Sequence, residues 1–135
     1  MALDGMLSKS NRTATLANRG LLEAAADRTG DAVADFNAAL ARNPALADVY
    51  VNRGAALLRA GHYVEARADF DRALNLKTSN AAVAYLDRGM AQEKNGDIAA
   101  AYRDYKQALQ ISPDFEPAKV ELARFHVASD RVASR

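Results

Sequence analysis

The feature that most constrains this chain is an internal repeat. Gly20, Gly54 and Gly89 each close an Asn-Arg-Gly or Asp-Arg-Gly triplet, and they lie 34 and then 35 residues apart. Five columns of residues, the glycines included, share these two offsets, which indicates three copies of one structural unit with one residue inserted within 77–81. The other four columns are Ala32, Ala66 and Ala101; Phe36, Phe70 and Tyr105; Ala39, Ala73 and Ala108; and Leu40, Leu74 and Leu109.

Within each copy, the apolar residues have the spacing of two helices. In the second copy a stripe at i, i+4, i+7 and i+8 begins at Tyr50, and a second stripe begins at Ala66. Gly61 lies between the stripes and predicts the turn that ends the first helix. Pro44 and Pro113 follow second helices, which Pro cannot continue. One such hairpin cannot cover its own apolar face, so the copies must stack on one another.

This pattern resembles the tetratricopeptide repeat, a helix pair of about 34 residues. The matching positions are the small residue of the first helix, then Ala, an aromatic residue, Ala and a closing Pro, and they cover Thr13–Phe115. The resemblance implies an all-α fold, a right-handed α-solenoid of antiparallel helix pairs. The expected units are a short N-terminal helix or lead-in at 1–12, repeats at 13–46, 47–81 and 82–115, a capping helix at 116–128 and a flexible tail at 129–135.

The turn of the first repeat departs from this pattern. Asp27 stands where Gly61 and Gly96 of the later repeats predict a glycine, and Gly30 follows three residues later. We therefore expect this turn to be reshaped. In the second repeat, Thr78 takes the place of the closing Pro.

The charged residues argue against one class of partner. The chain has 18 Lys and Arg and 17 Asp and Glu, interleaved along its length, for a formal net charge of +1. A protein that neutralises phosphates needs a basic stripe, so nucleic acid is not an expected partner. No apolar stretch approaches the ~20 residues of a membrane-spanning helix, so no membrane insertion is expected.

The style of the repeats, with Asn-Arg-Gly followed by Ala-Asp-Phe, resembles bacterial tetratricopeptide proteins, several of which are exported. The first residues lack the basic and apolar regions of a leader peptide. The location is therefore left open between the cytoplasm and, if a leader was removed, the periplasm.

Residues for catalysis are scarce. The chain has no Cys, which excludes a disulfide framework, a zinc ribbon and a thiol nucleophile. Its two histidines, His62 and His126, have no Cys, second His or acidic residue at metal-ligand spacing, and no phosphate-binding glycine loop occurs. We therefore expect no enzymatic activity, no cofactor and no metal.

An arginine in each copy precedes the repeated glycine, and an aspartate follows each arginine sixteen residues later. The arginines could form a ladder that grips carboxylates of a ligand, or each could pair with an aspartate of a facing helix. Charge and countercharge repeat together, which favours internal pairs that set the register of the helices. The pairs are Arg19 and Asp35, Arg53 and Asp69, and Arg88 and Asp104.

The resemblance also implies that the first helices of successive repeats line a concave groove. Leu58, Leu86 and Met90 are the expected apolar anchors of this groove. The predicted groove residues are Ala14, Ala17, Leu21, Ala24 and Ala25; Asp48, Val51, Asn52, Ala55, Leu58 and Arg59; and Val83, Leu86, Asp87, Met90, Glu93 and Lys94.

The best-known ligand of this groove in the family is the acidic C-terminus of a chaperone, held by Lys, Asn and Arg. In this chain only Asn18 and Asn52 remain as clamp members, without Lys or Arg companions. We therefore expect that the protein is not a carboxylate-clamp chaperone receptor. The clamp positions are mostly Ala17, Leu21, Asp48, Val83 and Asp87.

The expected function is that of a protein–protein interaction scaffold. An apolar groove suits an extended segment or an amphipathic helix of another protein. The alternative is a structural protein that self-associates, forming a homo-oligomer through the groove or the end faces.

Overall fold

The computed structural model describes the backbone of residues 2–133 and the side chains of residues 11–125. This part of the chain forms seven α-helices and no strand, which confirms the all-α class. The helices are α1 (Ala2–Ala25), α2 (Thr29–Arg42), α3 (Ala47–Arg59), α4 (Tyr63–Asn75), α5 (Ala81–Lys94), α6 (Ile98–Ile111) and α7 (Glu116–Ala133).

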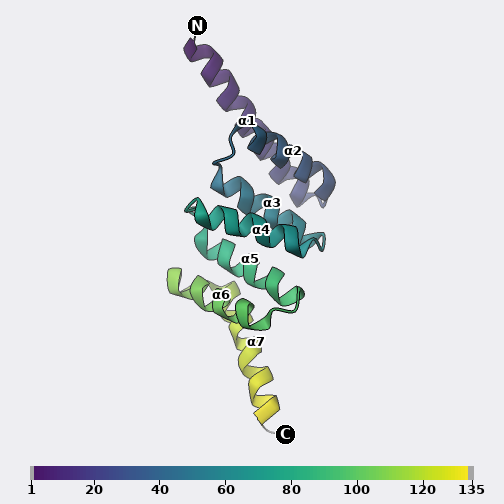
Figure 1. Ribbon diagram of the computed structural model, residues 1–135, viewed down its shortest axis with the longest axis vertical. Helices are drawn as coiled ribbons and strands as arrows, with labels where there is room; N and C mark the ends of the chain where they lie inside the picture. The colour runs from purple at the N-terminus through teal and green to yellow at the C-terminus, as the bar shows by residue number, and fades with distance from the viewer. Residues whose placement is uncertain (1, 134–135) are drawn as a thin grey trace.

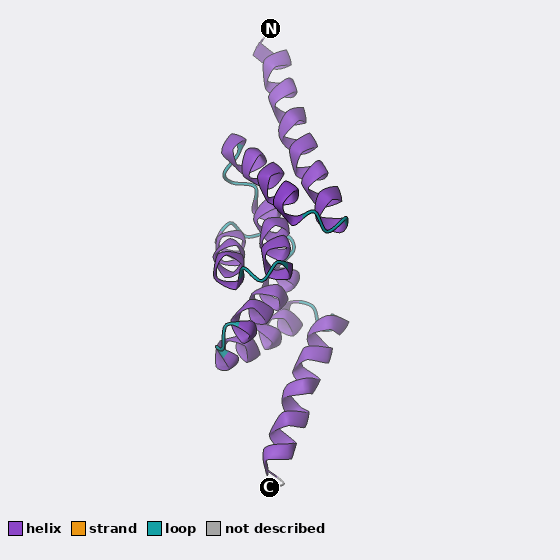
Figure 2. Ribbon diagram, turned by 90° about the vertical axis from the view of Figure 1, so that its right-hand side faces the viewer, coloured by secondary structure: helices purple, strands orange, loops and turns teal. Residues whose placement is uncertain are grey.

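The helices stack in the order of the sequence, as expected for an α-solenoid (Figure 1). α1 with α2, α3 with α4 and α5 with α6 form three antiparallel pairs, and α7 packs against α6 at the end of the stack. Figure 2 shows parts of α1 and α7 extending beyond the stack at opposite ends. None of the helices within residues 2–133 combines the length and the apolar character needed to cross a lipid bilayer.

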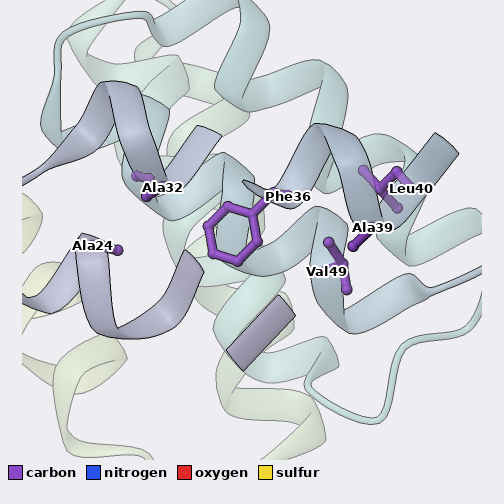
Figure 3. Packing of buried hydrophobic residues seen from close by; sticks show 7 residues of the cluster. Ala24, Ala32, Phe36, Ala39, Leu40 and Val49 are labelled. Carbon is purple, nitrogen blue, oxygen red and sulfur yellow. The ribbon is translucent and has the colours of Figure 1, made fainter. Parts of the chain in front are cut away.

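A glycine against an aromatic ring holds each helix pair together. A Cβ atom added at Gly20 would lie 2.6 Å from the Phe36 ring, and one added at Gly54 would lie 2.8 Å from the Phe70 ring. Phe36 and Phe70 are 0% exposed, and Figure 3 shows Phe36 surrounded by the small and aliphatic side chains of its cluster. The helices can approach this closely because the first one lacks a side chain at this point. The glycine column and the aromatic column of the sequence are therefore the two partners of one contact between the paired helices.

The turn between α1 and α2 is not reshaped, so that expectation was wrong. Asp27 has φ +59°, in the same left-handed region as Gly61 at +87° and Gly96 at +91°. The amide of Arg28 donates to the carbonyl of Glu23 at 2.8 Å, and the corresponding bonds close the other two turns, at 2.9 and 2.8 Å. Aspartate is one of the few residues other than glycine that tolerate this conformation, so it preserves the turn.

The inserted residue is accommodated between α4 and α5. Lys77 has φ +57°, and the amide of Thr78 donates to the carbonyl of Ala73 at 3.1 Å. The Thr78 hydroxyl donates to Asp48 Oδ1 at 2.7 Å, which ties this connection to α3. Thr78 is 7% exposed, and its partly buried hydrogen bond takes the place of the closing Pro of the other repeats.

The two ends of the chain differ from the expected boundaries. A single helix runs from Ala2 to Ala25, so residues 1–12 do not form a separate short helix within the described backbone. α7 continues to Ala133, past residue 128, where a flexible tail was expected. The last residues of that tail, 134–135, and the side chain of His126 lie outside the described residues.

Candidate functional site

The repeated arginines form internal ion pairs, which confirms the structural interpretation. Arg53 Nε and Nη2 donate to the two carboxylate oxygens of Asp69 at 2.8 and 2.7 Å. Arg88 makes the same bidentate contact with Asp104 at 2.8 and 2.9 Å. Arg19 and Asp35 repeat it at 2.6 and 2.7 Å, and the hydrogen bonds from Arg19 hold the pKa of the Asp35 carboxyl below its usual value.

Two of these arginines also reach back to the preceding repeat. Arg53 Nη1 donates to Asn37 Oδ1 at 2.8 Å, and Arg88 Nη1 donates to Asp71 Oδ1 at 2.9 Å. Both guanidinium groups lie over a tyrosine ring of their own helix, with 5.4 Å for Arg53 and 5.3 Å for Arg88 to the ring centroid. Their donors are used inside the stack, so they do not form a ligand-binding ladder.

The structure buries three of the predicted groove residues. Ala24 and Leu86 are each 7% exposed and Val51 is 3% exposed, and each belongs to a hydrophobic cluster. The prediction that Leu86 anchors a ligand was therefore wrong, because its side chain packs in the core. The sequence stripe assigned to the groove includes the edge of the packing face, which helical spacing alone does not separate from it.

Two acidic groove residues are held by the scaffold. Asp48 accepts hydrogen bonds from Thr78 and from Ser79 in the α4–α5 connection. Glu93 accepts from the Tyr105 hydroxyl at 2.7 Å and from Arg124 Nη2 at 2.9 Å, which links α5 to α6 and to α7. Both carboxylates stabilise the stack, which limits their use toward a ligand.

Arg59 and Asp87 are charged residues in the middle of the first-helix face, the surface formed by α1, α3 and α5. Arg59 Nη2 donates to the carbonyl of Ala24 at 3.1 Å, which connects α3 to α1. Burial raises the pKa of Asp87 to about 6, and the positive charge of Arg59 opposes this rise. Asp87 is therefore ionised at neutral pH but becomes neutral in mildly acidic solution.

The remaining predicted groove residues are accessible to different degrees. Leu21 is 44% exposed and Val83 is 37% exposed. Ala14, Ala25 and Lys94 are also exposed. The half-buried residues are Ala17, Asn52, Ala55, Leu58 and Met90.

A cavity of about 710 Å³ opens where α1 meets the connection between α2 and α3. Sequence analysis had assigned Ala14 and Ala17 to the groove and Asn18 to a partial clamp, but it missed the lining residues from α2, the connection and α3. The sequence did contain one signal for Arg42. The first copy has an arginine at a position where the other two copies have the apolar residues Leu76 and Ile111. The lining consists of Thr13, Ala14, Ala17, Asn18, Arg42, Asn43, Leu46 and Val49.

The lining of this cavity combines polar and aliphatic side chains. Arg42, Asn18 and Asn43 contribute a cation and two side-chain amides, and Leu46 and Val49 contribute aliphatic surface. No acidic residue is among the lining residues. Within the part of the chain whose side chains are described, no group of three His, Cys, Asp or Glu residues is placed to hold a metal ion.

Comparison with known proteins places the chain among helical repeat proteins. Sequence models of the tetratricopeptide repeat match residues 47–80 and 82–115. The Hsp70-Hsp90 organizing protein of Triticum aestivum is 36% identical over 98 residues, which cover 73% of this chain and 17% of that protein. A second curated relative, of which the match covers 10%, is sperm-associated antigen 1 of Rattus norvegicus, so the chain spans less than a fifth of these relatives.

Solved structures agree over most of the chain. The Arabidopsis OM64 TPR domain superposes with a TM-score of 0.84 at 28% identity, covering 89% of this chain and 98% of that one. The second TPR domain of human RPAP3, solved in complex with the HSP70 peptide SGPTIEEVD, superposes with a TM-score of 0.79 at 25% identity, covering 86% and 96%.

These relatives correct two expectations. The exclusion of chaperone peptides as ligands was wrong, because the similar proteins include an Hsp70-Hsp90 organizing protein and a domain bound to an HSP70 peptide. That exclusion considered only a few positions on the first helices and left out the residues that α2 and the following connection bring to the cavity. A bacterial origin finds no support, since the relatives come from plants and animals. Matching repeats, helix pairs and superposed structures establish that the chain belongs to the tetratricopeptide repeat family.

Proposed function

We propose that this domain is a non-catalytic binding module for the acidic end of a partner polypeptide, of the kind represented by the HSP70 peptide ending in Glu-Glu-Val-Asp. The observation that carries the proposal is the likeness to the RPAP3 domain solved with that peptide, at a TM-score of 0.79. The 36% identity to an Hsp70-Hsp90 organizing protein supports the same ligand class. The proposal concerns this domain alone, since the chain spans 17% of that relative.

The first-helix face offers contacts that suit an extended peptide. Asn52 lies half-buried in the middle of α3, where its amide can donate to and accept from a peptide main chain. Leu58 and Met90 are half-buried and add apolar contact on α3 and α5. Lys94 is exposed at the end of α5 and supplies a positive charge for acidic side chains.

The proposal is tested by titrating the domain with fluorescently labelled SGPTIEEVD and following the anisotropy. We expect saturable binding that a scrambled peptide of the same composition does not show. Asn52→Ala should weaken binding about tenfold, the effect of losing hydrogen bonds to a partly buried amide. Asn75→Ala is the matched control, because Asn75 is exposed near the end of α4, outside this face, and its loss should leave affinity unchanged.

Equal binding of the ordered and scrambled peptides would contradict the proposal. Self-association through the groove or the end faces stays a prediction, and light scattering over a concentration series measures it in the same samples. An average molecular mass that rises with protein concentration and falls on addition of SGPTIEEVD would indicate that self-association and peptide binding use one surface.

A further inference from the structure

We propose that Glu23 and Asp35 share one proton in the contact between α1 and α2, and that the first repeat loosens when this proton is lost. The contact between the two helices is then a pH-sensitive element of the domain. This inference goes beyond the proposed function and does not depend on which ligand the domain binds.

Glu23 brings a second carboxyl group to an ion pair that has one cation. Arg19 uses Nε and Nη2 for the two oxygens of Asp35, whereas Glu23 Oε1 lies 3.7 Å from Arg19 Nε, beyond hydrogen-bond distance. The Glu23 side chain is 18% exposed, and its Oε2 atom is buried without a hydrogen-bond partner among the described residues. A buried carboxylate oxygen of this kind is costly unless it carries a proton that it can donate. The Asp35 carboxylate is placed to accept that hydrogen bond.

The third repeat makes the same contact with a permanent donor. Gln92 occupies the position of Glu23, and its side-chain nitrogen faces two acceptors, Asp104 Oδ2 at 2.9 Å and the carbonyl of Ala100 at 3.2 Å. The second repeat has Leu57 at this position, so it brings no polar side chain there. An acid can replace the amide only while it keeps its proton, because an ionised carboxylate has no hydrogen to donate.

The surroundings favour the protonated form of Glu23. Burial raises the pKa of its carboxyl group, and the adjacent Asp35 raises it further, whereas Arg19 opposes the rise. Asp31, on the same helix as Asp35, adds negative charge on that side. From α3, Arg59 reaches α1, but it donates to a main-chain carbonyl rather than to the Glu23 carboxyl.

The direction of the pH dependence follows from this rise in pKa. In the unfolded chain a glutamate loses its proton at about pH 4.3, and in the folded domain Glu23 keeps its proton to a higher pH. The contribution of Glu23 to stability is therefore complete below the pKa of the unfolded chain and is lost as the pH rises through the pKa of the folded state. Ionisation leaves two carboxylates beside one arginine, which weakens the contact that holds α1 and its part of the first-helix face.

The test compares the wild-type domain with Glu23→Gln, which supplies a permanent donor as in the third repeat, between pH 5 and pH 8.5. The variant should melt a few degrees above wild type at the basic end, and this difference should shrink toward the acidic end, because only wild type loses its donor as the pH rises. Glu116→Gln is the matched control, since Glu116 is an exposed glutamate in the first turn of α7, and its difference from wild type should stay constant. Parallel profiles of wild type and Glu23→Gln would overturn the inference.

A second measurement locates the proton in the unmodified domain. In NMR spectra, the carbon-13 signal of the Glu23 carboxyl should titrate above the usual range of glutamates, and that of Asp35 should titrate below the usual range of aspartates. A Glu23 signal that titrates in the usual range would show that the two carboxyls do not share a proton.

Amide hydrogen exchange compares the first and third repeats within one sample. The Arg28 amide closes the α1–α2 turn by donating to the Glu23 carbonyl, and the Asp97 amide closes the α5–α6 turn by donating to the Gln92 carbonyl. As the pH rises, the protection factor of the Arg28 amide should fall severalfold relative to that of the Asp97 amide. A constant ratio of the two protection factors would show that losing the proton does not loosen the first repeat.

Discussion

The first and third repeats carry the same Arg-Gly dipeptide and the same ion pair, but in different surroundings. The Arg19 side chain is 61% exposed, whereas that of Arg88 is 21% exposed. Arg88 has a preceding repeat and donates to Asp71 on it, while Arg19 has none and lies near Glu23 of its own helix, 3.7 Å away. The position of a repeat in the stack therefore decides how much its arginine is buried, even where the arginine and its aspartate partner are the same.

The two ends also differ in what covers them. Beyond the third repeat, Phe125 of α7 packs against Tyr102 and Tyr105, with ring centroids 5.6 and 5.8 Å away. Arg124 of the same helix joins Glu93 of α5. At the first repeat, the cavity beside α1 stays open. The chain therefore covers its third repeat with α7, whereas the cavity lies where the first repeat meets the second.

The largest expected effect is a difference in stability between variants of the Arg88 and Arg19 ion pairs. Arg88→Ala should lower the free energy of unfolding by about 3 kcal/mol, because it leaves Asp104, 6% exposed, without its cation. Arg19→Ala should cost clearly less, since water screens the exposed Arg19 pair. Urea denaturation followed by circular dichroism measures both. Equal losses would show that burial in the stack does not distinguish the repeats.

A smaller effect separates two glycines. Gly89→Ala should destabilise the domain by about 1–3 kcal/mol, because the new methyl group would lie 2.7 Å from the Tyr105 ring and 3.2 Å from the carbonyl of Ala101. Gly30→Ala should instead stabilise it by about 0.5–1 kcal/mol, because Gly30 lies in α2 and a Cβ there meets nothing within 4 Å. Thermal melts of the two variants test the sign. A stabilised Gly89→Ala variant would contradict the proposed packing role.

The smallest effect concerns the charge at the third repeat. As pH falls from 7.5 through about 6, Asp87 gains a proton and stops repelling an acidic peptide, so the affinity of the wild-type domain should rise. Asp87→Asn removes this charge at every pH. It should bind SGPTIEEVD roughly threefold more tightly at pH 7.5, about what one solvent-screened charge pair is worth.

Anisotropy titrations at pH 5.5, 6.5 and 7.5 check this prediction. The carboxyls of the peptide ionise mostly below this window, so Asp87→Asn should also flatten the pH dependence. If the affinity of Asp87→Asn for the peptide changes with pH as steeply as that of the wild type, another group is responsible for the pH dependence.

Most of the fold could be predicted from the sequence because its main contacts are repeated. The glycine that faces the aromatic ring and the arginine that faces the aspartate leave columns at fixed offsets, which are visible without coordinates. The length of α1 could not be predicted in this way. The chain has no Pro from Ala2 to Ala25, and Gly5 within it does not end the helix. The conformation of the turn at Asp27 was predicted wrongly, because glycine is the commonest residue with positive φ but aspartate can adopt it too.

The candidate site was harder to predict. The surface stripe of α1 could be read from helical spacing, but Arg42 and Asn43 reach it from α2 and the connection that follows. Which loop lies beside which helix depends on how the pairs stack, and no local pattern encodes it. Burial of Val51 and Leu86 is of the same kind, since residues of α5 pack in the cluster of Val51 and residues of α6 and α7 pack in the cluster of Leu86.

The bridges between repeats imply that the sequence also specifies where the stack stops. The acceptors for the bridging arginines are Asn37 on α2 and Asp71 on α4, and the same column holds Lys106 on α6. The arginine column itself continues as Leu122 on α7, which packs into the last hydrophobic cluster. At the junction of α6 and α7, the acceptor column therefore holds a lysine and the donor column holds a leucine. A further repeat of the same kind would place its arginine against a lysine, so like charges oppose a fourth repeat at this junction, and α7 occupies that position with Leu122 in place of the arginine.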